Sequence, residues 1–227
     1  MKYTKHDLHI HTNFSDGHHS PQKIIKLSNC LNNGIKVIGF TDHVRSRHFG
    51  TKVNSYIQEI EELQQSIDLQ ILLGGEITLL YFEVARIEEK FANKSKFPFL
   101  SKVQYLLFEN IFSIGDIPDI CYIQQLFSIP IGLAHFSYQF LKESPRTSIE
   151  KVADVIASSG LFLELNTHRL NYMLEKQFYE CCIDLGTPLS LGSDAHSSSY
   201  VGEVDHALEY LRKLGKLNLL IDPSQFG

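Results

Sequence analysis

The 227-residue chain lacks any apolar run long enough to span a bilayer, and its N-terminus has no apolar leader-like segment. Its four cysteines form no Cys-x-x-Cys pair, and Cys181 and Cys182 are adjacent within a predicted helix, where they are poorly placed to bridge each other. This pattern favours reduced thiols over a disulfide framework. We therefore expect a cytoplasmic protein without a membrane partner.

Positive charge is also scarce. The formal net charge is -5, and the longest basic stretch is Arg45-Ser46-Arg47. Broad electrostatic binding of nucleic acid is therefore not favoured, although a local phosphate pocket is compatible with this balance. Hydrophobic residues make up 43 % of the chain and charged residues 21 %, as in ordinary globular proteins, and no linker or low-complexity tract divides it. We expect a single domain over residues 1–227.

Histidine, in contrast, is plentiful, with 11 residues. His9 and His11 lie at the end of a predicted strand, where side chains two positions apart point to the same face. Asp16 follows within reach of a second metal ion. A random His-x-His should occur about half a time in a chain of this composition, so the pair gains weight only if further ligands recur.

Seven apolar segments are predicted as strands. They cover residues 6–10, 36–40, 69–73, 103–108, 129–134, 161–165 and 188–191. The connections between and after them contain predicted helices over residues 21–33, 54–66, 81–91, 116–127, 148–158, 170–185 and 203–214, with a loop at 94–98. The mean repeat of about 32 residues matches one βα unit, and the alternation of strand and helix favours a parallel sheet.

Polar side chains follow the carboxyl end of every predicted strand. They are His9 and His11, Asp42 and His43, Glu76, Glu109, His135, Glu164 and Asn166, and Asp194 and His196. A (β/α) barrel collects its active site at this end of all its strands, whereas an open sheet uses one crevice. The sequence therefore predicts a seven-stranded TIM-like barrel.

Histidine and carboxylate are ligands suited to zinc, manganese or iron. There are too many of them for one tetrahedral site, so we expect a cluster of two or three divalent ions. Adjacent ions stabilise both the attacking and the leaving oxygen in phosphoryl hydrolysis. Taken singly, each residue also has a structural interpretation: His135 as a core or surface histidine, Asp42 or Asp194 as a helix N-cap, and Glu164 as an edge charge.

Three residues are candidates for contact with a substrate. Arg169 and Arg45 carry guanidinium groups that match phosphate oxygens, and Asn166 lies at a strand end. A surface position remains the alternative for each arginine.

Five short motifs occur in order along the chain: His9-x-His11-Thr12-x-x-Ser15-Asp16-Gly17, Gly39-Phe40-Thr41-Asp42-His43, Gly75-Glu76, Ala134-His135 and Ser193-Asp194-Ala195-His196. In this combination the sequence resembles the PHP family, named for polymerase and histidinol phosphatase. The resemblance spans residues 9–196. It implies a distorted (β/α)7 barrel with up to three metal ions at the carboxyl ends of its strands, which agrees with the strand count reached from periodicity.

The resemblance also implies which residues hold each ion. The first ion is expected on His9, His11, Glu76 and Asp194, the second on Glu76 and His135, and the third on Asp16, His43 and His196. Family members usually give the second ion another histidine from the strand after Glu76. Here residues 103–110 contain no histidine, and Glu109 is the best substitute.

These features favour hydrolysis of a phosphate monoester by a metal-bound hydroxide, as in a histidinol phosphatase. The candidate catalytic residues are His43, His196 and Asp194, with His43 or His196 giving a proton to the leaving alkoxide. The expected partner is a small phosphorylated substrate.

Three other functions stay open. A PHP-type phosphodiesterase or 3′–5′ exonuclease would act on nucleotides or DNA ends, although the lack of a basic stripe counts against nucleic acid. An amidohydrolase-type barrel also begins with His-x-His, but it would require a lysine ligand at the end of the fourth strand, and Lys102 precedes that strand. The third is a non-catalytic remnant that keeps the fold and part of the metal binding.

Overall fold

Seven parallel strands form one sheet in the order of the sequence, in a computed structural model that describes residues 3–28, 33–44, 49–78, 99, 102–144 and 146–226. Each strand pairs with the next, which is the arrangement of a barrel wall. All seven predicted strands are present: β1 (His6–Ile10), β2 (Val37–Phe40), β3 (Gln70–Thr78), β4 (Tyr105–Glu109), β5 (Ile131–Leu133), β6 (Phe162–Asn166) and β7 (Leu189–Gly192).

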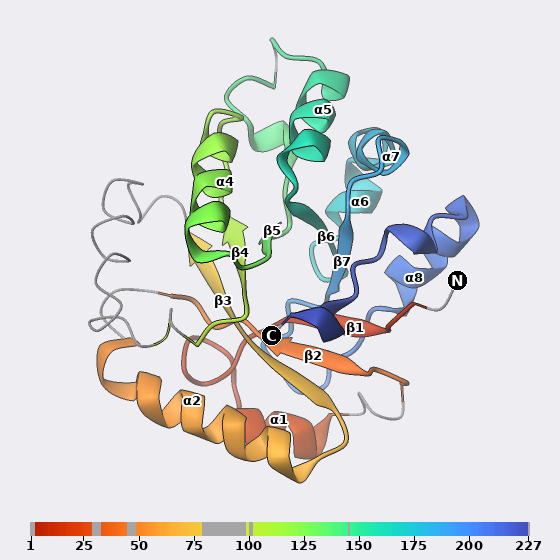
Figure 1. Cartoon of the computed structure of the whole chain (residues 1–227). Helices are drawn as coiled ribbons and strands as arrows, with labels where there is room; N and C mark the ends of the chain where they lie inside the picture. The colour runs from red at the N-terminus through yellow and green to blue at the C-terminus, as the bar shows by residue number, and fades with distance from the viewer. Residues whose placement is uncertain are drawn as a thin grey trace.

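Helices surround the outside of these strands (Figure 1). They are α1 (Pro21–Leu27), α2 (Phe49–Ser66), α4 (Asp116–Phe127), α5 (Ile149–Ser159), α6 (Asn171–Leu174), α7 (Lys176–Asp184) and α8 (Asp205–Leu214), with 3-10 turns η4 (Tyr138–Phe140), η5 (Leu217–Leu219) and η6 (Pro223–Gln225). In the described part of the chain, none of these helices is both long and apolar enough to cross a membrane.

Local sequence signals explain where several helices begin and end. The Ser20 side chain accepts from the Lys23 N–H at the start of α1, where Pro21 is the first helical residue. Ser148 caps α5 in the same way, and Gly160 ends that helix with a φ of 75°.

The barrel is nearly closed between its first and last strands. Among the described residues, β1 and the chain after β7 share an isolated bridge between Ile10 and Ala195 instead of a continuous ladder. A register irregularity lies within β1, between Asp7 and Ile10. Side chains complete the seam: the Leu191 N–H donates to His6 Nε2 at 3.1 Å, and the Asp7 carboxylate accepts from the Ser193 N–H at 2.9 Å.

The amino end of the barrel interior is filled by apolar and aromatic side chains. Tyr105 lies at its centre, packed against Phe226 from the end of the chain, and its hydroxyl donates to the Leu8 carbonyl at 2.8 Å. The ring occupies the space where neighbouring strands have glycine: a Cβ at Gly39 would lie 1.8 Å from its oxygen, and one at Gly74 would lie 2.5 Å from its Cζ. The polar residues therefore gather at the opposite, carboxyl end.

The structure corrects four expected boundaries. Strand β3 continues to Thr78 instead of ending at residue 73, so Glu76 lies inside it. Helix α1 ends at Leu27, not at residue 33, because Ser28 is extended. Helix α2 begins at Phe49, five residues before the predicted start. The helix predicted over 170–185 is two helices, since Glu175 breaks it with φ and ψ of -114° and 43°. The helix predicted over 81–91 and the loop at 94–98 lie outside the described residues.

Candidate metal centre

Nine predicted ligands meet at the carboxyl mouth of the barrel. Eight of them form four overlapping groups of three whose ligand atoms lie within 4.8 Å of one another: His9, His11 and Glu76; His11, Asp16 and His43; His11, Asp194 and His196; and His43, Glu76 and Glu109. The ninth, His135, places Nε2 3.2 Å from a Glu76 oxygen. The chain thus brings together every residue that was predicted as a ligand, while binding of metal by each of them stays a prediction.

His9 and His11 point to the same side, as their spacing predicts. Their Nε2 atoms are 3.0 Å apart. The His9 Nε2 is 3.3 Å from Glu76 Oε1 and 3.6 Å from Asp194 Oδ1, and the His11 Nε2 is 3.4 Å from oxygens of the same two residues. The four groups expected for the first ion therefore converge on one point.

Asp16 brings together the group expected for the third ion. Its carboxylate lies 3.4 Å from His43 Nε2 and 3.6 Å from His196 Nε2. The His196 Nδ1 is 3.0 Å from the Asp194 carbonyl, a contact that holds the proton on Nδ1 and leaves Nε2 for a ligand or a proton transfer.

Glu76 lies at the centre of the cluster, and Glu109 borders it from β4. The Glu76 carboxylate contacts His43 Nδ1 at 3.1 Å in addition to the three histidines already named. Glu109 lies 3.5 Å from His43 Nδ1 and 3.8 Å from His135 Nε2, and its other neighbour is the Thr78 hydroxyl, which donates to it. Glu109 therefore occupies the side of the cluster where the sequence has no histidine.

Buried atoms without hydrogen bonds show that this donor set fits metal ions. Within the described ranges, His11 Nδ1, His43 Nδ1 and Glu76 Oε1 are buried and have no hydrogen-bond partner. Such groups are costly to bury unless something satisfies them. All three are of the nitrogen and oxygen types that zinc, manganese and iron accept, and the nearest charged neighbours of each are other members of the cluster.

Glu164, which the sequence left as an edge charge, holds two of the histidines. One of its oxygens accepts from His9 Nδ1 at 2.7 Å, and the other accepts from the His135 N–H at 2.7 Å. Carboxylates commonly hold ligating histidines in this way, and the bond keeps the His9 Nε2 lone pair directed at the cluster. Gly192 makes room for it, because a Cβ there would lie 1.9 Å from Glu164 Oε1. Along β6, Glu164 lies on the same face as Phe162 and Asn166, because every second residue of a strand points to the same side. This spacing was the sequence signal for the role of Glu164.

Asp42, another strand-end residue, supports the loop that carries Asp16. Its Oδ1 accepts from the Thr12 N–H at 2.8 Å and from the Ser15 N–H at 3.1 Å, and its Oδ2 accepts from the Thr12 hydroxyl. With these bonds the carboxylate is fully buried and faces the loop. It thus acts as a structural group rather than as an additional ligand of the cluster.

A family model for the PHP domain matches residues 7–168, which is more than two thirds of the chain. The chain belongs to the PHP family. Its PHP model covers the segments that bear His9 through Glu164, and Asp194 and His196 lie beyond the match.

A search of curated proteins finds no match. Among solved structures, an adenine deaminase from Arthrobacter aurescens is similar with a TM-score of 0.52 and 10% identity, over 88% of this chain and 70% of that one. A mutant organophosphorus hydrolase is similar with a TM-score of 0.49 and 10% identity, over 96% and 73% of the two chains. The first likeness agrees with a TIM-like barrel for this PHP protein.

Protons and metal ions compete for the ligand side chains of the PHP cluster. Burial alone would lower the pKa of His9, but the negative charges of Glu164, Glu76 and Asp194 raise it well above the ordinary value. Burial would raise the pKa of Glu76, yet His9 and His135 hold it well below its usual range. The buried carboxylates are therefore stabilised by nearby positive charge, which either protons or divalent ions supply.

Of the three residues predicted to contact the substrate, one lies at the mouth, one is buried, and one lies outside the described residues. Arg169 reaches the mouth with a half-exposed side chain and lies 3.4 Å from Asp194 through its Nε. With the ligand residues it lines a pocket of about 250 Å³. Asn166 is buried and already accepts from the N–H groups of His168 and Arg169 while donating to Glu164, so it positions this turn. Arg45 lies outside the described residues.

PHP membership and the His and carboxylate cluster together support a metal-dependent hydrolase.

Proposed function

We propose that this protein hydrolyses phosphate monoesters with the help of two or three divalent ions, of zinc, manganese or iron. The observation that carries the proposal is the central position of Glu76, whose two oxygens lie within 3.4 Å of nitrogens of four histidines. A carboxylate in this place is suited to bridge two ions. Bound ions would lower the pKa of an attacking water and neutralise charge on the phosphate oxygens.

The residues of the chain would divide the remaining work. His9, His11, Glu76 and Asp194 would hold one ion, Glu76, His135 and Glu109 a second, and Asp16, His43 and His196 a third. Arg169 would bind phosphate, because its guanidinium lies at the mouth beside Asp194 and matches phosphate oxygens.

His196 is the better placed of the two candidate proton donors. Its side chain is 37% exposed at the mouth, compared with 12% for His43. The hydrogen bond with Asp16 raises the pKa of His196, which favours a proton on Nε2 that could pass to the leaving alkoxide. Ligation and proton transfer use the same nitrogen, and the role of donor would therefore require His196 to leave the third ion's ligand set.

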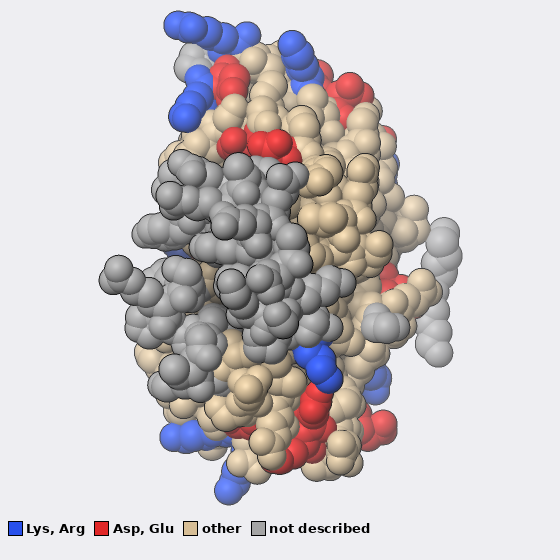
Figure 2. All heavy atoms as spheres, turned by 60° about the vertical axis from the view of Figure 1, so that its left-hand side comes forward, with Lys and Arg blue, Asp and Glu red and all other residues tan. Residues whose placement is uncertain are grey.

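The charges visible on one face of the described structure do not favour the exonuclease alternative. On the face in Figure 2, the visible Lys and Arg side chains are scattered among Asp and Glu and form no continuous stripe. A protein that tracks a nucleic acid backbone requires such a stripe. The amidohydrolase alternative lacks its lysine, because Lys102 lies before β4 and pairs with Glu61 at 3.2 Å.

The direct test is metal analysis combined with a substrate panel. The purified protein, loaded in turn with manganese, zinc and iron, would be assayed on phosphate monoesters including histidinol phosphate, on bis-p-nitrophenyl phosphate and on DNA. We expect phosphate release from monoesters alone. Cleavage of the diester or of DNA with no monoester activity would replace the proposal by the phosphodiesterase alternative.

A pair of histidine variants completes this test. His9→Ala should lose bound metal and hydrolysis together, because it removes a buried ligand and takes away the partner of Glu164 Oε1. His206→Ala is the matched control, since His206 is exposed on α8 and bonds to Tyr172 instead. Unchanged metal content in His9→Ala would refute the assignment of the site.

A further inference from the structure

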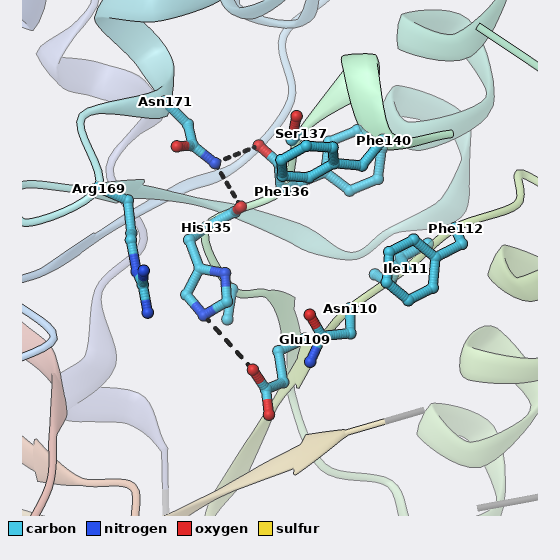
Figure 3. A pocket seen from close by; sticks show the side chains of 11 residues that line it. Glu109, Asn110, Ile111, Phe112, His135, Phe136, Ser137, Phe140, Arg169 and Asn171 are labelled. Carbon is cyan, nitrogen blue, oxygen red and sulfur yellow. Dashed lines mark hydrogen bonds and ion pairs between the residues drawn. The ribbon is translucent and has the colours of Figure 1, made fainter. Parts of the chain in front are cut away.

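A second cavity opens beside the metal cluster, and the proposed reaction does not yet use it (Figure 3). Its volume is about 190 Å³. It shares Glu109, Asn110, His135 and Arg169 with the mouth pocket, so the two spaces adjoin. Its other wall combines apolar side chains with Ser137 and Asn171. We call this space the side pocket and define its apolar wall as Ile111, Phe112, Phe136 and Phe140.

The two ends of the side pocket differ in chemistry. In Figure 3, Arg169 and His135 lie on one side and Phe112 and Ile111 on the other, with Phe140 above. The polar end is therefore the end nearest the cluster. A molecule that lies in both pockets would place a phosphate beside Arg169 and an apolar group between the phenylalanines.

Hydrogen bonds hold the part of the wall that follows β5. The Asn171 side chain donates to the carbonyls of His135 and Phe136, as Figure 3 shows. The Tyr179 hydroxyl donates to the Phe136 carbonyl at 2.8 Å. The Tyr138 N–H donates to Glu175, the residue at which the predicted helix over 170–185 is broken. Glu175, which lies at the break between α6 and α7, thus holds the backbone of this wall at Tyr138.

The part of the wall that follows β4 is tied down as well. The Lys142 N–H donates to the Phe112 carbonyl at 2.7 Å, and the neighbouring Ser113 hydroxyl donates to Glu143 at 2.5 Å. Both walls are therefore fixed in the absence of a ligand, as is usual for pockets that bind small molecules.

The size of the side pocket limits what can enter it. An apolar cavity of about 150 Å³ is large enough to hold benzene, so about 190 Å³ accommodates one six-membered ring or a compact alkyl group. A nucleobase with its sugar is about twice as large as such a ring. The charge of the Glu109 carboxylate at the entrance further disfavours a negatively charged group.

We propose that the side pocket binds the organic group of the substrate, and that this group is a single ring or compact apolar unit without negative charge. This inference rests on the proposed phosphatase function and narrows its substrate class. Water adds to phosphorus, the bond between phosphorus and the ester oxygen breaks, and the oxygen leaves with a proton as the alcohol. The alcohol is the part that lies against Phe112, with the largely exposed Phe140 ring at the rim of the side pocket.

The experiment compares benzyl phosphate, ethyl phosphate and thymidine 5′-monophosphate as substrates of the metal-loaded protein. We expect kcat/KM for benzyl phosphate to exceed that of each of the other two by about tenfold or more, because only its ring fills the side pocket. Phe112→Ala should lower kcat/KM for benzyl phosphate about tenfold more than for ethyl phosphate. Phe140→Ala should have a smaller effect of the same sign, because its ring is 70% exposed at the rim. Leu174→Ala is the matched control, because it removes an apolar side chain that is 75% exposed outside the side pocket.

A binding measurement separates the side pocket from turnover. Titration calorimetry with benzylphosphonate and ethylphosphonate, which are not hydrolysed, should give a Kd about tenfold lower for the benzyl compound, and Phe112→Ala should remove that difference. Equal kcat/KM values and equal Kd values for the benzyl and ethyl compounds would overturn the inference and leave the phosphatase function standing. Absence of hydrolysis for every monoester would overturn the function, and the inference with it.

Discussion

The barrel is joined in two different ways on the two sides of the metal cluster. Between β3 and β4, a backbone ladder runs through five residue pairs from Gly74 and Tyr105 to Thr78 and Glu109. Between β1 and β7, ionisable side chains take over: Asp7 accepts from Ser193 and from the Gly202 N–H at 2.8 Å. The ligands His9, His11, Asp194 and His196 all belong to this second seam.

The difference shows where the cluster is vulnerable. A ladder is built from backbone groups, which substitutions leave in place, so Glu109 can change without loss of the wall that carries it. At the β1 and β7 seam, the backbone contributes hydrogen bonds from the His11 N–H to the Ala195 carbonyl and from the Ala195 N–H to the His9 carbonyl. The remaining contacts across it depend on the Asp7 and His6 side chains and on their protonation. We therefore expect changes at the β1 and β7 seam to affect the free energy of unfolding more than changes at β4.

The largest effect should come from Asp7→Ala. The substitution leaves the N–H groups of Ser193 and Gly202 buried without an acceptor, which should lower the free energy of unfolding by about 3–5 kcal/mol. Urea denaturation followed by circular dichroism measures it. Asp7→Asn keeps an acceptor oxygen and should lose less. A loss below about 1 kcal/mol for Asp7→Ala would show that the seam does not depend on this carboxylate.

Acid should weaken the same seam through His6. Burial lowers the pKa of His6 to about 4 and outweighs the hydrogen bond to the Thr4 carbonyl, which by itself would raise it. The ring is therefore neutral at pH 7, and its Nε2 accepts from the Leu191 N–H. Between pH 6.5 and pH 4 the unfolded chain binds the extra proton. The free energy of unfolding therefore falls as the pH falls through this window, by about 3 kcal/mol in total.

The test for His6 compares wild type with His6→Gln in metal-free buffer, because metal binding would add its own pH dependence to the free energy of unfolding. Between pH 7 and pH 5, wild type should lose about 2 kcal/mol more of its unfolding free energy than the variant. Parallel pH dependence in the two proteins would contradict the assignment.

Gly192→Ala should have an intermediate effect on stability and a clear one on metal binding. The new Cβ would collide with Glu164, so we expect about 2 kcal/mol of destabilisation and, once His9 loses its partner, about 10–100-fold weaker metal binding. Ser190→Ala on the same strand is the control, since its buried hydroxyl has no hydrogen bond in the described structure. Equal metal affinity in the two variants would rule out a positioning role for Glu164.

The smallest effect on folding should come from Glu109→Gln. The amide retains an oxygen for the Thr78 hydroxyl, and the β3 and β4 ladder is untouched, so stability should change by less than about 0.5 kcal/mol. The loss of one carboxylate should nevertheless reduce the bound metal by one ion per chain, as measured by mass spectrometry of the metals. An unchanged metal count would remove Glu109 from the ligand set.

The sequence predicted the strands and the convergence of the ligands because both depend on local patterns. Apolar runs marked the strands, and the carboxyl ends of parallel strands meet at one mouth. Gly74 and Gly75 misplaced the end of β3, because glycine usually interrupts a strand. Here Gly74 is required by the ring of Tyr105, which lies 31 residues further along the chain.

The supporting residues were harder to foresee. Asp7 lies two positions before His9, yet the irregular register of β1 turns it to Ser193 and Gly202 instead of the cluster. Glu164 is separated from His9 by 155 residues, and only the closed barrel brings them together. Alternation along one strand indicates a face but cannot indicate the partner across a seam.

The aromatic side chains around Tyr105 and Phe226 limit the routes by which small molecules can reach and leave the cluster. Because side chains occupy the amino end of the barrel interior, a substrate of the proposed reaction would enter from the carboxyl mouth, and both products would leave the same way. The alcohol in the side pocket and the phosphate beside Arg169 would then share one exit. Release would follow an order, and the product that leaves last would inhibit the next turnover by competing with substrate.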